Sequence, residues 1–225
     1  MIFDESKVDN NNPEKEAMEN DIGKRWLKIF KSFRKDDNHA FLDVGPEYTF
    51  TDHLGYGDLK NTNGACYQLV AALALRNNPE INELTNEREL NPEDIKRMVD
   101  DKVLSDLKIL DLGCGSEPTF ARVARQMGAK VYTVDEISSD KFYANDKMPK
   151  EMKDEERQYH ITLDLYDPNA TEKIRQISGG DFDMTTESYL NADLFTGDGE
   201  KISLPLIKDG GIYYKTSDAN VVTVK

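Results

Sequence analysis

The sequence is poor in cysteine, in histidine and in long apolar runs, and each shortage excludes a kind of protein. The two cysteines, Cys66 and Cys114, are too few for a disulfide scaffold or a multi-cysteine metal site, and they fit a reducing compartment. The three histidines are scattered, without the spacing of metal ligands. No run of about 18 apolar residues is present, and the polar start is not a secretory signal. We therefore expect a cytoplasmic protein with no metal site and no membrane span.

Positive charge is also scarce. Lysine and arginine total 29 against 43 aspartates and glutamates, which gives a net charge of -14 at pH 7. Duplex nucleic acid needs a basic face on its partner, so no such partner is expected. The exception is residues 23–35, where six positive charges accompany apolar residues at helical spacing. This pattern predicts a helix over 22–33 that packs its apolar face on the domain, or that instead touches an anionic partner or a membrane surface.

The pattern of apolar residues divides the chain into three parts. Residues 1–20 are polar and rich in Asn and Glu, which predicts a flexible arm. Residues 21–107 form a mostly helical extension, in which the almost wholly apolar segment 65–75 predicts a buried helix. Residues 108–225 alternate strands and helices, which is typical of an α/β fold with a parallel sheet. The expected strands are 108–112, 130–134, 159–163, 181–185 and 211–216.

A glycine turn follows the first of these strands and carries the strongest functional signal. Gly113 and Gly115 flank Cys114 between the strand and a helix expected over 119–127. Glycine at such a turn lets the backbone approach a ligand closely. Asp135 ends the next strand, where a carboxylate can accept hydrogen bonds from two ribose hydroxyls. The layout predicts a nucleotide-type ligand site at the carboxyl edge of the sheet.

The charges around this turn favour a cationic ligand. Asp111 precedes the turn and Glu117 follows it, so a pyrophosphate is repelled while an ammonium or sulfonium group is attracted. A dinucleotide fingerprint also has a third glycine where this chain has Pro118. The pattern therefore favours a cationic nucleoside over NAD.

Residues 103–115 (Val-Leu-Ser-Asp-Leu-Lys-Ile-Leu-Asp-Leu-Gly-Cys-Gly) and the strand end at Asp135 resemble the class I S-adenosylmethionine-dependent methyltransferase family. Weaker matches at 163–165, 182–184 and 208–212 follow in the family's order. The resemblance covers about half of the chain. It implies a Rossmann-like parallel sheet flanked by helices, with S-adenosylmethionine as cofactor.

The resemblance also implies roles for five residues. Asp111, Gly113 and Gly115 would line the amino-acid part of the cofactor, Asp135 would hold its ribose, and Asp164 would meet its adenine amino group. For Asp164, a simple loop cap is an equally good interpretation. Cys114 is interpreted as a small residue in a tight turn, because nothing near it in the sequence indicates an activated thiolate.

The chain departs from the family in two places. Glu117 stands where the family often has a third glycine. After the strand at 211–216 there is room for one antiparallel strand, 221–224, where the family usually has two more strands. We therefore expect a sheet that is shortened at the C-terminus.

Candidates for catalysis follow the fourth strand, whose end faces the methyl group in the family. Glu187 is a candidate base, and Tyr189 or Asn191 a candidate for orienting an acceptor. A polar loop without catalytic role is the alternative for each. His160, at a strand start, is expected to be structural.

The function that these patterns predict is methyl transfer from S-adenosylmethionine to a small molecule, or, as a lesser expectation, to a protein side chain. One alternative is a non-catalytic S-adenosylmethionine-binding or regulatory domain of the same fold. A second is an NAD-dependent oxidoreductase, against which Asp111 and Pro118 argue. The sequence leaves the acceptor and the oligomeric state open.

Overall fold

The structure is a computed structural model of the chain. The predicted arm, together with Glu117, Tyr189 and Asn191, lies outside the residues that it describes. Those residues are 21–32, 34–36, 39–40, 63–85, 92–116, 118–142, 150–187, 198–215 and 221–225.

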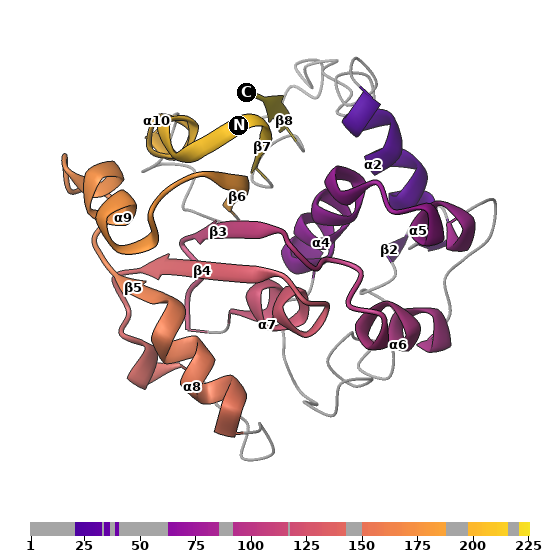
Figure 1. The fold of residues 1–225 in the computed structure, drawn as a ribbon, viewed down its shortest axis with the longest axis horizontal. Helices are drawn as coiled ribbons and strands as arrows, with labels where there is room; N and C mark the ends of the chain where they lie inside the picture. The colour runs from indigo at the N-terminus through magenta and orange to yellow at the C-terminus, as the bar shows by residue number, and fades with distance from the viewer. Residues whose placement is uncertain are drawn as a thin grey trace, which may run out of the picture.

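A six-stranded sheet forms the centre of the molecule (Figure 1). Its strand order is β5-β4-β3-β6-β7-β8; the first five strands are parallel, and β8 pairs antiparallel with β7. The strands are β3 (Lys108–Leu112), β4 (Lys130–Asp135), β5 (His160–Thr162), β6 (Phe182–Glu187), β7 (Ile207–Lys215) and β8 (Val221–Val224). This is a Rossmann-like α/β fold, as the alternation of strands and helices predicted.

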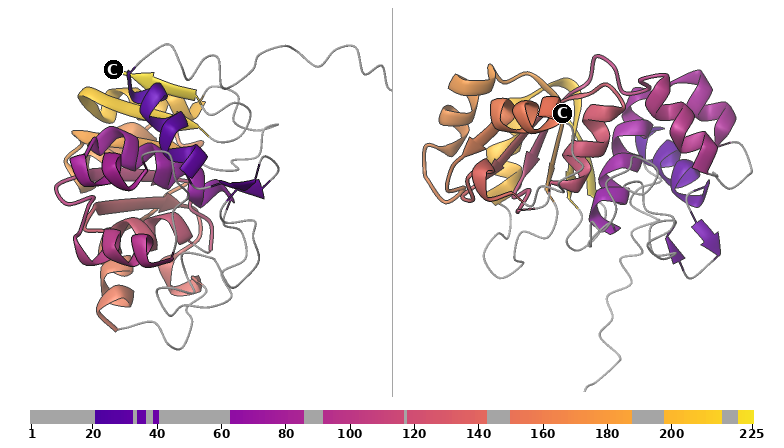
Figure 2. Two further views of the ribbon diagram at one scale, coloured as in Figure 1. Left: turned by 90° about the vertical axis from the view of Figure 1, so that its right-hand side faces the viewer. Right: turned by 90° about the horizontal axis from the view of Figure 1, so that it is seen from below.

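The N-terminal helices pack with one face of the sheet into a single hydrophobic core (Figure 2). This core joins Leu73, Ile95 and Phe120 to Ile109 and Met184 of the sheet. Two short strands, β1 (Arg34–Asp36) and β2 (His39–Ala40), pair with each other outside the main sheet. The helices are α2 (Asp21–Ser32), α4 (Asn63–Arg76), α5 (Pro79–Leu84), α6 (Pro92–Asp100) and α7 (Thr119–Gln126).

The charged helix predicted over 22–33 is α2, and its apolar face packs on the domain. Trp26 and Ile29 are buried, and the Trp26 ring lies 6.4 Å from that of Tyr214 in the sheet. The Arg25 Nε donates a hydrogen bond of 2.8 Å to the carbonyl of Ala74 near the end of α4. The apolar face of α2 is therefore part of the core. No helix among the described residues is long and apolar enough to cross a bilayer.

The other face of the sheet is covered by a second core cluster. Leu110, Val134 and Phe182 pack there against Ile174 and Ile202 of the later helices. Figure 2 shows α9 (Ala170–Ser178) and α10 (Asp198–Ser203) on the side of the sheet away from the N-terminal helices. The later elements are η4 (Ser139–Lys141), α8 (Lys150–Tyr159), α9 (Ala170–Ser178), α10 (Asp198–Ser203) and η5 (Leu204–Leu206).

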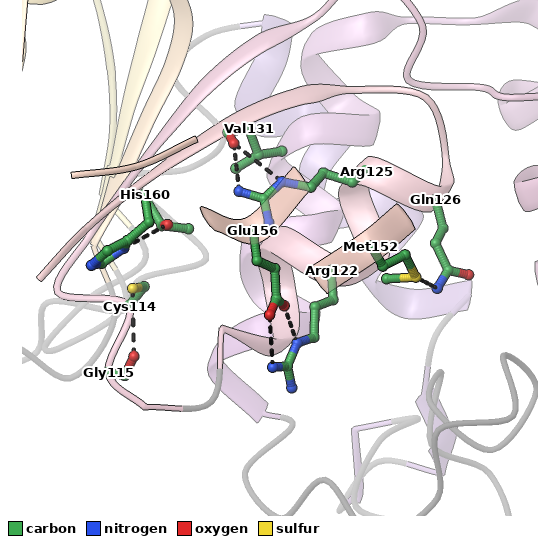
Figure 3. Close-up of polar contacts among 10 residues, drawn as sticks. Cys114, Gly115, Arg122, Arg125, Gln126, Val131, Met152, Glu156 and His160 are labelled. Atoms are coloured by element: carbon green, nitrogen blue, oxygen red, sulfur yellow. Dashed lines mark hydrogen bonds and ion pairs between the residues drawn. The ribbon is translucent and has the colours of Figure 1, made fainter. Parts of the chain in front are cut away.

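A buried ion pair joins α7 to α8 (Figure 3). The Arg122 side chain is 1% exposed and that of Glu156 is 5% exposed. Two nitrogens of the Arg122 guanidinium, Nε and Nη2, donate hydrogen bonds to the Glu156 carboxylate, the one from Nη2 at 3.2 Å. Two parallel hydrogen bonds of this kind offset part of the cost of removing both charges from water.

We predict that Glu156→Ala lowers the free energy of unfolding by about 3–5 kcal/mol, because it leaves the buried Arg122 charge without its carboxylate. Urea unfolding followed by circular dichroism measures the loss. Asp154→Ala, on an exposed carboxylate of the same helix, is the matched control and should cost less than about 1 kcal/mol. Equal costs for the two variants would contradict the prediction.

Candidate functional site

The glycine turn after β3 lies at the carboxyl edge of the sheet. Gly113 and Gly115 have φ angles of +66° and +65°, a conformation that favours glycine. The Gly113 N–H donates a 2.8 Å hydrogen bond to the carbonyl of Val134, which anchors the turn on β4. A Cβ added at Gly115 would meet no atom of the described residues within 4 Å. The described residues therefore leave the backbone at Gly115 accessible, and the contacts of Gly113 and Gly115 with a cofactor stay predictions.

Asp135 is the last residue of β4, and its side chain also anchors the glycine turn. One carboxylate oxygen accepts from the Gly115 N–H at 2.8 Å, and the other accepts from the Ile137 N–H at 3.0 Å. Each oxygen of a carboxylate can accept more than one hydrogen bond. Asp135 is half-buried, so it can shape the turn and still accept ribose hydroxyls. The first of these roles was not foreseen from the sequence.

Asp111 lies almost wholly buried one strand away, with 3% of its surface exposed. Its Oδ1 accepts a 3.0 Å hydrogen bond from the amide nitrogen of Gln68, and within the described part of the chain no group donates to its Oδ2. Burial raises the pKa of Asp111 to about 7, against the lowering effects of Gln68 and of the Arg125 charge. A cationic ligand group could donate to Oδ2 and add a second positive charge to that of Arg125.

Gln68 and Thr186 are site residues that the sequence analysis missed. The same amide nitrogen of Gln68 also donates to the Thr186 hydroxyl at 3.1 Å. The available signal was a single amide side chain inside the otherwise apolar segment 65–75, because a buried amide needs polar partners. Nothing in the sequence around Thr186 marks it as that partner.

Cys114 lies in the middle of the turn, and its surroundings favour the protonated thiol. Burial raises its pKa well above the ordinary value, and the nearby charges of Asp111 and Asp135 act in the same direction. Its Sγ lies 3.5 Å from the carbonyl of Gly115 (Figure 3). A thiol in this state is a poor nucleophile, which agrees with its interpretation as a small residue in a tight turn.

His160 supports the loop after β4. Its Nε2 donates to the carbonyl of Ile137 at 2.8 Å, so its Nδ1 accepts from the Thr133 hydroxyl at 3.0 Å. Burial lowers the pKa of His160, and its ring stacks edge-on against Phe142 at 4.7 Å. These contacts give His160 a structural position beside Asp135.

Asp164 follows β5 and has an exposed side chain. Its carboxylate accepts from the Tyr166 N–H at 2.9 Å, which caps the turn after the strand. The Leu163 N–H donates to the carbonyl of Asp135 at 2.9 Å, so this turn starts beside the end of β4. The predicted contact of Asp164 with an adenine amino group stays a prediction.

Glu187 ends β6 on the opposite face of the sheet from Asp111. Successive strand residues point to opposite faces, and its neighbour Thr186 faces Gln68. The Glu187 carboxylate instead packs against Gly199 of α10 and lies 3.6 Å from the Lys215 ammonium. Burial raises its pKa. The structure therefore does not bring Glu187 together with Asp111, and its role as a base stays a prediction.

The described ranges contain no group of three or more His, Cys, Asp or Glu side chains that could hold a metal ion. The site that they do contain is a glycine turn between two carboxylates, Asp111 and Asp135, at the ends of adjacent parallel strands. The chemical capacity of this arrangement is to bind a ligand that has a cationic group and hydroxyls.

No protein-family model matches the sequence, and no curated protein matches it. Among solved structures, it is similar to a precorrin-6y C5,15-methyltransferase from Geobacter metallireducens GS-15, with 13% identity and a TM-score of 0.35 over 58% of this chain and 64% of that one. It is also similar to the MycE methyltransferase of the mycinamycin biosynthetic pathway. One MycE structure, in complex with Mg and SAH, has 17% identity and a TM-score of 0.34 over 83% of this chain and 45% of that one. This chain spans less than two thirds of the length of each of these proteins.

We predict that Asp111→Asn stabilises the protein at alkaline pH. The unfolded chain releases the Asp111 proton near the ordinary carboxyl pKa, but the folded protein keeps it to about pH 7, so the wild type loses stability as pH rises through this window. An amide escapes this loss and still accepts from Gln68. Between pH 5 and pH 8 the variant should gain about 2–3 kcal/mol relative to wild type in urea unfolding. If the difference in the free energy of unfolding between variant and wild type does not change with pH, Asp111 is not a buried acid.

A second prediction concerns the packing of Glu187. A Cβ at Gly199 would overlap the Glu187 carboxylate, so Gly199→Ala should lower the free energy of unfolding by about 1–3 kcal/mol. Thermal and urea unfolding measure the cost. The same substitution in a Glu187→Ala background is the control and should cost much less, because the carboxylate is gone. Equal costs in both backgrounds would place Glu187 elsewhere.

Proposed function

We propose that this chain binds S-adenosylmethionine at the carboxyl edge of β3 and β4 and transfers its methyl group to a small molecule. The observation that carries the proposal is the pair of carboxylates on either side of a glycine turn. Asp111 suits a cationic amino-acid moiety, and Asp135 suits ribose hydroxyls. The acidic net charge of -14 and the helical extension packed on the sheet favour a small acceptor over a large anionic one.

The chemistry of such a reaction makes modest demands on the protein. When bound, S-adenosylmethionine supplies an electrophilic methyl group. The chain has to hold the cofactor and align an acceptor with it, and proximity and orientation provide most of the rate. Asp111, Gly113, Gly115 and Asp135 are the residues that would hold it. Glu187 remains the candidate for a base that accepts a proton from the acceptor.

A second candidate is a domain that binds S-adenosylmethionine without transferring its methyl group. The observation that favours it is the position of Glu187, which lies on the face of the sheet away from Asp111 and packs against α10. Binding and turnover must therefore be measured separately.

We predict micromolar binding of S-adenosylmethionine in calorimetric titrations, and no binding of NAD. Asp135→Ala should weaken the affinity by about 1–3 kcal/mol, because ribose hydroxyls lose their acceptors and the turn loses its support. Asp100→Ala, on an exposed carboxylate of α6, is the control and should bind like wild type. Circular dichroism and thermal unfolding confirm that each variant is folded.

The outcomes separate the candidates. Conversion of bound cofactor to S-adenosylhomocysteine with a panel of small-molecule acceptors supports methyl transfer, and conversion with proteins alone moves the acceptor to a side chain. Binding without turnover on either panel supports the non-catalytic domain. Failure to bind S-adenosylmethionine overturns the cofactor assignment, and binding of NAD in its place supports an oxidoreductase.

A further inference from the structure

Gln68 links the N-terminal helices to the candidate site. It comes from the middle of α4 and is 1% exposed. Its amide nitrogen donates to Asp111 Oδ1 at 3.0 Å and to the Thr186 hydroxyl at 3.1 Å. Asp111 and Thr186 are paired residues on the adjacent strands β3 and β6. One side chain of α4 therefore spans a pair of neighbours in the sheet.

Both hydrogens of the Gln68 amide nitrogen are donated in hydrogen bonds, which fixes the orientation of the amide. Rotation of the amide by half a turn would place its oxygen against the Asp111 carboxylate, and two acceptors would then face each other. The Thr186 hydroxyl holds the amide from the other side. As a result, one oxygen of Asp111 is always occupied, and Oδ2 is the oxygen that remains for a ligand.

We propose that Gln68 is a positioning residue for the cationic group of the ligand, because it occupies one oxygen of Asp111 and leaves the other for an ammonium group. This inference rests on the proposed function, since it assigns the recognition of the ligand's amino-acid moiety to a contact that the helical extension provides. Gln68 acts through Asp111 and does not itself touch the ligand.

The surroundings of Asp111 make its hydrogen bond from Gln68 important for its ionisation. Arg125 of α7 attracts the carboxylate, but the hydrogen bonds from its Nε and Nη2 go to the carbonyl of Val131 at 3.2 and 2.7 Å. Asp135 repels the Asp111 charge, and the Cys114 thiol is neutral. Gln68 is thus the only described hydrogen-bond donor to the charged form. Without it, the pKa of Asp111 rises further, and a larger share of Asp111 is neutral near neutral pH.

The test compares two adenosine ligands with wild type and Gln68→Met. S-adenosylhomocysteine carries the amino-acid group, and 5′-methylthioadenosine carries the same adenosine and a thioether without it. Methionine matches glutamine in size and suits a buried helix, but it donates no hydrogen bond. The affinity of Gln68→Met for S-adenosylhomocysteine should fall about tenfold or more at pH 7.5, while that for 5′-methylthioadenosine stays within about twofold.

The pH profile provides a readout that general damage would not move. The pH at which S-adenosylhomocysteine affinity reaches half of its plateau should be higher in Gln68→Met than in wild type, because Asp111 then ionises at a higher pH. In an Asp111→Asn background, Gln68→Met should have no further effect on the ratio of the two affinities.

A variant of Thr186 tests the same inference from the other end of the Gln68 side chain. Thr186→Val, which is isosteric, removes the second hydrogen bond of Gln68. It should lower the ratio of S-adenosylhomocysteine affinity to 5′-methylthioadenosine affinity by a smaller factor than Gln68→Met does. Thr186→Val serves as the test if Gln68→Met does not fold.

Failure of this inference is distinct from failure of the proposed function. If wild type binds neither ligand, the proposed function falls and the inference falls with it. If wild type binds both ligands and Gln68→Met weakens both equally, or neither, the cofactor site stands and the role of Gln68 is overturned. An unchanged affinity ratio in Thr186→Val, where Gln68→Met is unfolded, overturns it as well.

Discussion

The candidate site depends on the burial of one carboxylate, Asp111, at the carboxyl edge of the sheet. Removal from water disfavours its charge, and its pKa is raised to about 7. Gln68 offsets part of this cost by a hydrogen bond, and Arg125 adds a favourable charge from α7. The N-terminal helices therefore share more than a hydrophobic core with the sheet, because one of them also stabilises the charge at the candidate site.

The turn next to this carboxylate takes its shape from the neighbouring strand. Gly113 donates to a carbonyl of β4, and Gly115 donates to the Asp135 side chain. Pro118, at the start of α7, provides no side-chain cap. The carboxylate proposed to hold the ribose thus also fixes the backbone that faces the ligand. Loss of Asp135 removes a ligand contact and the support of the turn together.

The local sequence pattern was sufficient to predict the central strands but not the later helices. β3, at 108–112, was predicted to the residue, because an apolar run ended by glycine is a local signal. α8 was not predicted, since its ten residues contain few apolar ones and its buried member is Glu156, which is held by a residue of another helix. β7 begins at Ile207, four residues earlier than expected, where its pairing with β6 has an irregular register that leaves no mark in the sequence.

By itself, the sequence determined a glycine turn with carboxylates at the ends of two adjacent strands. The alternation of strand and helix brings those ends to one edge, so residue spacing alone predicts their proximity. Only the tertiary structure decided which other side chains meet them. Gln68 reaches Asp111 from a helix 43 positions away in the sequence, and Thr186 joins it while Glu187 is directed to the opposite face. Contacts of this kind depend on helix packing and strand register, which are set by the whole core and not by any local pattern.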